Sequence, residues 1–223
     1  GPYVGVALLL LVIWLVMLVR KMPTAAKREG DTHWLVSLRR LLQNRNYRWG
    51  VTAQFFYVGA QIGVWSYTIR YIMQELGVNE SQGANYYLGA LALFMVSRFA
   101  FTGLLKYFSA IGLLTGSAVA AMFFTLIVIG SGGYVGAIAL VAISGCMSLM
   151  FPTIFGLAVR GTGDDRKLAG SGLIMAILGG AVMTAIQGQI SDYSGRIELS
   201  FVVPLLCFFV VVIFGLISKK QVS

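Results

Sequence analysis

The sequence is poor in charged residues, and in acidic residues above all. Charged side chains make up 11% of the 223 residues, and only eight residues are Asp or Glu, whereas 58% are hydrophobic and the mean hydropathy is +0.82. A typical soluble domain has roughly 25% charged residues. Because so few charges cannot cover a soluble surface, the composition excludes a soluble protein and predicts a chain that lies mostly in lipid.

Residue types that carry catalysis or bind metals are also scarce. The one histidine, His33, lies in a polar stretch, and the two cysteines, Cys146 and Cys207, lie within apolar runs. This pattern indicates no disulfide framework, and it offers no Ser/His/Asp, Cys/His or metal-ligand combination. We therefore expect no catalytic residue, no metal and no cofactor, and we do not expect an enzyme.

The hydrophobic residues gather in seven runs, each long enough or nearly long enough to cross a bilayer. About 20 apolar residues span the hydrocarbon core as a helix, and a helix satisfies its own backbone hydrogen bonds in lipid. The pattern predicts an all-α polytopic membrane protein with about seven transmembrane helices. The runs are Tyr3–Val19, Tyr47–Met73, Ala84–Tyr107, Ile111–Ile129, Tyr134–Val159, Leu168–Ile190 and Leu199–Ile217.

One long polar stretch, Arg20–Asn46, separates the first two runs. Apolar residues recur in it at helical spacing, with arginines elsewhere on the helical wheel. This predicts an amphipathic helix that either lies at the lipid headgroups or forms a solvated linker. The apolar residues are Trp34, Leu35, Leu38, Leu41 and Leu42.

Basic and non-basic loops alternate along the chain. All Lys and Arg residues except Arg70, Arg98 and Arg196 lie in or beside the connections that follow the first, third, fifth and seventh runs. Cytoplasmic loops are enriched in Lys and Arg, so we expect an outside N-terminus and a cytoplasmic C-terminus in a bacterial inner membrane. This topology accounts for the net charge of +9, and no nucleic-acid partner is expected.

Two arginines are the ionisable residues embedded in the runs. Every Asp and Glu lies in a loop or at the end of a run. Because a proton relay needs an embedded titratable group, we do not expect this chain to couple protons by itself. Arg70 lies near the outer interface, where it either snorkels to the headgroups or serves as a gate or in substrate binding. Arg98 lies deeper, where it either pairs with backbone carbonyls or an absent helix, or acts directly in function.

The second run carries a polar stripe. Gln54, Tyr57, Gln61, Trp65 and Thr68 follow a helical rhythm that places them on one face. Buried amides and hydroxyls cost free energy unless they are hydrogen-bonded. The stripe therefore either lines a cavity for a neutral sugar, which needs hydroxyl partners and a flat aromatic face, or supplies hydrogen bonds between helices. The spacing favours neither explanation over the other.

Several segments resemble a known family. Ala53-Gln-Phe-Phe-Tyr-Val-Gly-Ala-Gln61, followed by Trp65-Ser-Tyr-Thr-Ile-Arg-Tyr71, is similar to the seventh helix of the fucose permease and glucose/galactose transporter group of the major facilitator superfamily. The resemblance continues through Met147-Ser-Leu-Met-Phe-Pro-Thr-Ile-Phe155 and Gly188-Gln-Ile-Ser-Asp192. It covers nearly the whole chain.

The resemblance implies half of a proton-linked monosaccharide transporter that works by alternating access. Residues 1–20 correspond to the sixth helix, 21–46 to the basic cytoplasmic linker, 47–218 to the C-terminal six-helix bundle and 219–223 to a cytoplasmic tail. The implied partners are a hexose-type sugar, membrane lipid, the N-terminal six-helix bundle and a proton that is coupled through that bundle. We therefore expect the chain to be part of a larger protein.

We expect the second run to supply most of the substrate contacts. Relatives that carry fucose tend to have a Gln-Tyr pair before the proline of the fifth run, where this chain has Met150-Phe151, so another hexose or an unusual substrate is favoured. Pro152 is expected to bend that helix, and Thr184 and Gln187 are secondary candidates. The expected sugar-binding residues are Gln54, Tyr57, Gln61, Trp65, Asn85, Ser148 and Phe151.

Two alternatives remain at this point. Seven spans in about 220 residues also describe a half-size sugar carrier that acts as an oligomer. The other is a membrane scaffold or receptor-like protein without transport activity. Sugar binding by the polar stripe distinguishes a sugar transporter from this non-transporting protein.

Overall fold

The computed structural model describes residues 5, 7–8, 11–12, 14–15 and 32–220, in two compact units, Gly1–Leu35 and Val36–Ser223. The described residues of the first apolar run are helical and exposed, and most of the basic linker lies outside the described residues. The described parts of the chain contain helices and no strand, which confirms the predicted all-α class.

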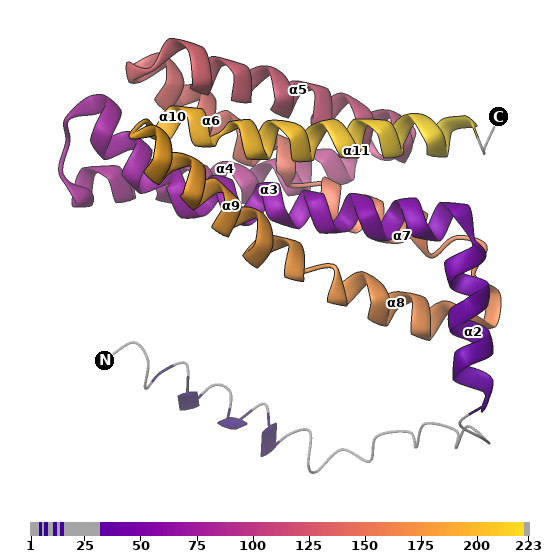
Figure 1. Ribbon diagram of the computed structural model, residues 1–223. Helices are drawn as coiled ribbons and strands as arrows, with labels where there is room; N and C mark the ends of the chain where they lie inside the picture. Colours follow the sequence, from indigo (N-terminus) through magenta and orange to yellow (C-terminus); the bar gives the residue numbers. More distant parts are fainter. Residues whose placement is uncertain (1–4, 6, 9–10, 13, 16–31, 221–223) are drawn as a thin grey trace. The chain divides into compact units, whose positions relative to one another are not determined.

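The elements follow one another along the sequence with short connections (Figure 1). They are α2 (Thr32–Gln43), α3 (Arg45–Leu76), α4 (Glu80–Leu104), α5 (Ala110–Ser131), α6 (Gly133–Met147), α7 (Met150–Ala158), the 3₁₀ turn η1 (Gly163–Asp165), α8 (Arg166–Met175), α9 (Leu178–Ser194), α10 (Ile197–Ser200) and α11 (Val202–Lys220).

Five helical segments of the described chain are long and apolar enough to cross a membrane. Each coincides with one of the last five predicted runs to within a few residues at either end. The segments are Glu80–Leu104, Ala110–Ser131, Gly133–Ala158, Gly163–Ser194 and Ile197–Lys220. The agreement reflects the simplicity of the signal, because an apolar run in lipid has no stable alternative to a helix.

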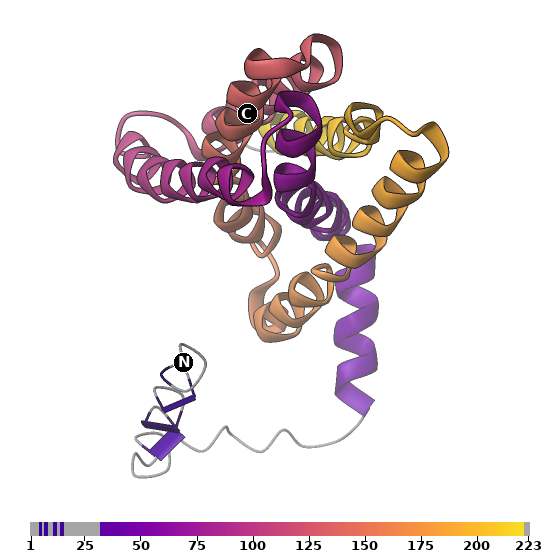
Figure 2. The same ribbon diagram turned by 90° about the vertical axis from the view of Figure 1, so that its left-hand side faces the viewer.

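The helix α3 is the central element of the second unit. Its first turn is capped by Asn44, whose side chain accepts a hydrogen bond from the Tyr47 backbone N–H, and it ends at Gly77, which has a φ of 64°. Its 32 residues rise roughly 48 Å at 1.5 Å per residue, enough to span a bilayer. It packs against α4, α6, α7, α9 and α11, which surround it (Figures 1 and 2). Because its polar stripe lowers its hydropathy, α3 is not among the five apolar segments.

Three of the spanning segments are interrupted. The break between α6 and α7 at Ser148-Leu149 and the break between α10 and α11 at Phe201 have the same cause. Pro152 and Pro204 lack the N–H that would bond to the carbonyl four residues earlier, and those carbonyls belong to Ser148 and Ser200. Each helix therefore stops near the carbonyl, Ser148 or Ser200, that receives no backbone hydrogen bond from the proline four residues later.

The third interruption, between α8 and α9, has no proline. The Ile177 and Gly179 backbone N–H groups bond to carbonyls three residues earlier, those of Ile174 and Ala176, which tightens the chain into a 3₁₀-like turn. Beyond it, α9 continues through Thr184-Ala185 without a break.

Close packing of α9 on α3 depends on glycine. A Cβ atom on Gly179 would collide with the Phe55 carbonyl, and one on Gly63 would collide with the side chain of Gln187. Small residues allow the backbones of membrane helices to approach closely, so these glycines set the separation of the two helices.

A smaller hydrophobic cluster closes the end of the bundle at which α3 begins. Leu41 of α2 is buried there against Tyr47, Ala158 and Leu173. The Arg40 guanidinium lies 3.1 Å from the Asp165 carboxylate. The helix α2 thus lies within the stretch expected to form a linker, and from Val36 onward it contacts residues of α3, α7 and α8.

Candidate functional site

The break between α6 and α7 is held by an arginine from another helix. Because Pro152 cannot donate to the Ser148 carbonyl, that buried oxygen needs a partner from elsewhere. Arg98 of α4 supplies it, with Nε at 3.2 Å and Nη2 at 3.0 Å from the Ser148 oxygen. Arg98 of α4 thus fixes the buried end at which α6 stops.

The polar stripe of α3 faces the same break. The Tyr57 hydroxyl donates to the Met147 carbonyl at 2.9 Å, and Trp65 Nε1 donates to the Ser144 hydroxyl at 3.2 Å. Tyr57 is fully buried, and Trp65 is half-buried. Two members of the stripe therefore join α3 to the last turn of α6.

Aromatic rings extend this contact to α4 and α7. The Trp65 and Phe94 rings meet edge to face with centroids 5.2 Å apart, and the Arg98 guanidinium lies 5.1 Å from the centroid of Phe94. On the other side of the break, the Phe151 and Tyr57 rings meet edge to face with centroids 6.3 Å apart. A cation placed over an aromatic face is attracted to it, so Arg98 is positioned by the ring as well as by the carbonyl.

Gln54 is the exceptional member of the stripe. Its side chain is fully buried, yet neither its amide oxygen nor its amide nitrogen has a hydrogen-bond partner among the described residues. A buried polar atom left without a partner costs about 1–3 kcal/mol. Gln61, two turns along, is half-buried, and the Thr68 hydroxyl donates to the Val64 carbonyl within α3.

The other sequence-predicted residues occupy different places. The Ser148 hydroxyl is buried and donates to Gly145, so this serine contributes to the break mainly through its carbonyl. Asn85 is exposed on α4 and lines a separate cavity of about 370 Å³. Arg70 is exposed on a different face of α3, with its guanidinium 5.8 Å from the Tyr67 ring.

The secondary candidates form a polar group beside α10. Gln187 is fully buried and its Nε2 lies 3.4 Å from the Ser200 hydroxyl. Gln187 Oε1 and the Thr184 hydroxyl are buried without a partner among the described residues. This group lies near the second proline-linked break and apart from the Tyr57–Ser148 region.

Sequence reasoning missed Phe94 and Ser144, and although it offered backbone carbonyls as one kind of partner for Arg98, it did not say which carbonyls these are. A side-chain pattern does not reveal backbone acceptors, but a proline within a span frees the carbonyl four residues earlier. That rule, applied to Pro152, identifies Ser148 and predicts a donor such as Arg98.

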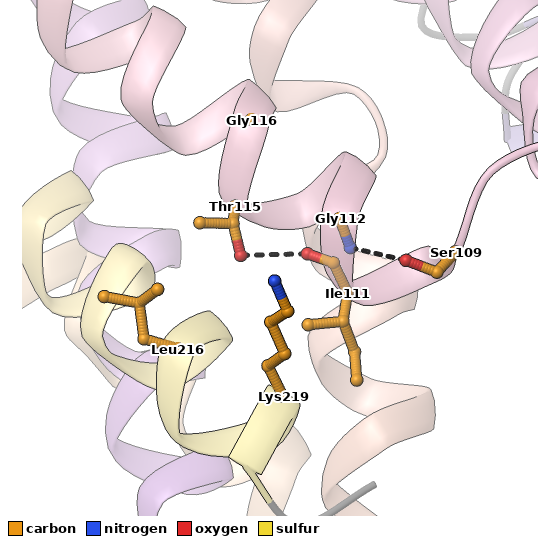
Figure 3. Close-up of a pocket in the computed structure, with 7 residues that line it drawn as sticks. All are labelled: Ser109, Ile111, Gly112, Thr115, Gly116, Leu216 and Lys219. Carbon is orange, nitrogen blue, oxygen red and sulfur yellow. Dashed lines mark hydrogen bonds between the residues drawn. The ribbon is translucent and has the colours of Figure 1, made fainter. Parts of the chain in front are cut away.

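A separate cavity lies apart from this region. It measures about 390 Å³ and lies between Lys219 of α11 and the start of α5. Beside it the Ser109 hydroxyl accepts from the Gly112 N–H and the Thr115 hydroxyl donates to the Ile111 carbonyl (Figure 3). Among the described residues, no group of three or more His, Cys, Asp or Glu side chains is placed to hold a metal ion.

The arrangement offers amides, hydroxyls and aromatic faces and no embedded carboxylate. The described acids lie at helix ends, where Glu75 accepts from the Gly133 N–H, Asp165 pairs with Arg40 and Glu198 pairs with Arg196. The region around the break therefore offers hydrogen-bonding groups and aromatic faces to a hydroxyl-rich ligand, with the Arg98 guanidinium beside them.

Comparison with known proteins supplies relatives. The chain is 38% identical over 222 residues to the L-fucose-proton symporter of Escherichia coli strain K12, covering 96% of this chain and 50% of the relative. It is 30% identical over 224 residues to a putative glucose/galactose transporter of Helicobacter pylori strain J99, covering 99% of this chain and 54% of that protein. The chain thus spans about half the length of the curated relatives it matches. No model of a protein family matches it.

Solved structures agree with the sequence comparison. A crystal structure of the major facilitator superfamily transporter FucP in the outward conformation matches with a TM-score of 0.85 at 37% identity, over 97% of this chain and 54% of that one. The relatives bear the names of transporters and not of enzymes, in agreement with the expectation from sequence.

Proposed function

Because the chain is a homologue of the fucose-proton symporter and glucose/galactose transporter group of the major facilitator superfamily, and matches roughly the C-terminal half of these proteins, we propose that it forms one wall of a sugar transporter. The observation that carries the proposal is the α6–α7 break, where Arg98 holds the Ser148 carbonyl and Tyr57 donates to the neighbouring Met147 carbonyl. Transporters place substrate sites at interrupted helices near the middle of the membrane.

The polar stripe supplies the sugar contacts in this proposal. Tyr57 and Trp65 already donate to α6, so they shape the wall. The amides of Gln54 and Gln61 then bind sugar hydroxyls, and the Trp65 and Phe151 rings face the C–H side of the sugar. Gln61 is half-buried and can meet a ligand directly, whereas Gln54 is fully buried and lacks a partner among the described residues, so in this proposal it meets a sugar hydroxyl only when the surrounding helices open.

The substrate we propose is a neutral hexose. The printed names of the relatives include both fucose and glucose/galactose. The apolar Met150-Phe151 pair before Pro152 favours a hexose other than fucose. Asn85, which lines a different cavity, belongs to an outer entry route.

Alternating access and proton coupling belong to the larger assembly. We propose that an N-terminal six-helix bundle forms the other wall and carries the proton-coupling acids, since the described acids of this chain lie at helix ends. The basic end, with Arg40 and Arg160, faces the cytoplasm in this arrangement, as the distribution of Lys and Arg indicates.

Replacing Gln61 with Ala in the complete transporter tests the site. Loss of one amide hydrogen bond to a neutral sugar is worth about 0.5–1.5 kcal/mol, so the apparent affinity in uptake assays should fall roughly 2- to 12-fold. Gln74→Ala is the matched control, because Gln74 is an exposed glutamine of the same helix. Unchanged affinity in the Gln61→Ala protein would remove this residue from the site.

A further inference from the structure

A cavity that contains two arginines lies beside the end of α4, whereas Asn85 lies near the start of that helix. It measures about 460 Å³ and lies between the end of α4, the start of α5, α7 and the segment that leads to α8. Leu105, Pro152, Gly156 and Leu157 form much of its apolar wall, and Arg160 and Arg166 contribute its charge. None of the sugar-binding candidates lines it.

The two arginines of this cavity form no ion pair with an acid of the described residues. No hydrogen bond or ion pair of the described residues involves either guanidinium group, and both side chains are exposed. The nearby acids lie elsewhere, because Asp164 and Asp165 line a different hollow beside Arg40, and Asp165 is paired with that arginine. The cavity therefore combines two guanidinium groups with no lining carboxylate.

The surroundings of the cavity are apolar and interfacial. Leu105 continues onto the exposed face of α4, where Phe99 is 75% exposed, and Tyr107 in the following loop is 84% exposed. Exposed aromatic residues at the end of a membrane helix mark the headgroup level. A ligand here would meet cations at one end and hydrocarbon at the other.

We propose that this cavity binds the headgroup of one anionic phospholipid. The phosphodiester lies between Arg160 and Arg166, where guanidinium groups bind phosphate through paired hydrogen bonds, and an acyl chain follows Leu105 along α4. Basic pockets between transmembrane helices on the cytoplasmic side are suited to acidic headgroups. The inference does not depend on which sugar is carried, or on transport itself.

Native mass spectrometry of the full chain in neutral detergent tests the proposal. Dioleoyl phosphatidylglycerol is expected to bind in preference to dioleoyl phosphatidylcholine, which has the same acyl chains and no net charge. Two arginines near a membrane surface contribute about 1 kcal/mol each, so Arg160→Gln with Arg166→Gln should reduce this preference by about tenfold or more. The control pair Arg39→Gln with Arg45→Gln removes the same charge from exposed positions of the linker region and should retain the preference.

A second variant keeps both arginines and fills the cavity. Gly156 lines the cavity, and a Cβ there meets no atom within 4 Å, so a larger side chain can begin at this position without a backbone collision. Gly156→Leu should also reduce the preference for phosphatidylglycerol. Gly89→Leu, at another open helical glycine outside this cavity, should not. If the arginine pair variant fails to fold, this comparison decides.

Three results would overturn the proposal. An unchanged phosphatidylglycerol preference in the arginine or Gly156 variants excludes the cavity as the site. Displacement of the lipid by inorganic phosphate at equal concentration indicates a site for a free anion. Loss of the preference in a longer protein that includes the preceding bundle shows that carboxylates of the protein occupy the arginines.

Discussion

At the scale of single residues, Arg98 links the backbone chemistry of one helix to the surface of another. Its guanidinium group bonds to the Ser148 carbonyl through two nitrogens and lies over the Phe94 ring. The side chain is exposed on α4, but the oxygen that it holds belongs to a buried residue. Loss of Arg98 therefore acts on α6 and α7 more than on α4.

Arg98→Gln should destabilise the protein by about 1–3 kcal/mol, because it leaves the Ser148 carbonyl buried without a charged donor. Thermal unfolding in detergent measures the effect. Arg70→Gln is the matched control, since Arg70 is exposed and is not hydrogen-bonded in the described structure. An equal loss of thermal stability in the two variants would show that the hydrogen bonds from Arg98 to the Ser148 carbonyl do not stabilise the protein.

The residue scale is also where prediction from sequence was weakest. The repeat of Gln54, Tyr57, Gln61 and Trp65 predicts a shared face, and Tyr57 and Trp65 do point to the same neighbouring helix. Their acceptors include the carbonyl of Met147, which no residue type reveals. Asn85 lies elsewhere because the face of α4 that carries it looks onto Ile138 and Val141 of α6, and the register between two helices is not encoded in either one alone.

At the scale of elements, the extents of the helices were predictable and their interruptions were not fully so. The fifth run, Tyr134–Val159, corresponds to α6 and α7 together, Gly133–Ala158. Its proline indicated a bend, and the chain breaks three to four residues before it, at Ser148-Leu149. The displacement has a physical reason, since proline removes a donor and the effect appears at the acceptor. The break at Ala176-Ile177 had no such signal.

Pro152→Ala tests the origin of the α6–α7 break. The new backbone N–H can bond to the Ser148 carbonyl, so the destabilisation caused by Arg98→Gln should shrink by about 1 kcal/mol or more in the Pro152→Ala background. Because Pro152 is exposed, the change opens no cavity in the core. Thermal unfolding of the four proteins of this double-mutant cycle gives the coupling. If the stability changes of the two single variants simply add in the double variant, Arg98 does not compensate for the donor that Pro152 lacks.

The same substitution has a functional counterpart. If the break is a moving part, sugar uptake by the complete transporter carrying Pro152→Ala should fall by roughly tenfold, which corresponds to about 1.4 kcal/mol, while thermal stability is retained. Pro204→Ala serves as the comparison, because it restores a donor at the α10–α11 break, away from Tyr57 and Arg98. Uptake at the level of the unmodified protein would argue against a moving break at Ser148.

At the scale of the whole molecule, the chain matches half of its relatives, and its described acids lie at helix ends. We therefore expect liposomes reconstituted with the 223-residue chain alone to show no proton-linked sugar uptake, whereas liposomes with the complete transporter do. Accumulation of labelled sugar under an imposed pH gradient is the measurement. Uptake by the chain alone would instead favour an oligomeric half-size carrier.

The low hydropathy of α3 has a consequence for biogenesis. A helix with two glutamines and several tyrosines near its middle partitions into lipid less readily than its neighbours, and α3 is not among the five strongly apolar segments. Yet α4, α9 and α11, which pack against it, follow it in the order of synthesis. We therefore expect stable insertion of α3 to await segments that leave the ribosome later, so that the helix that carries the proposed sugar-binding face is integrated cooperatively with the chain that comes after it.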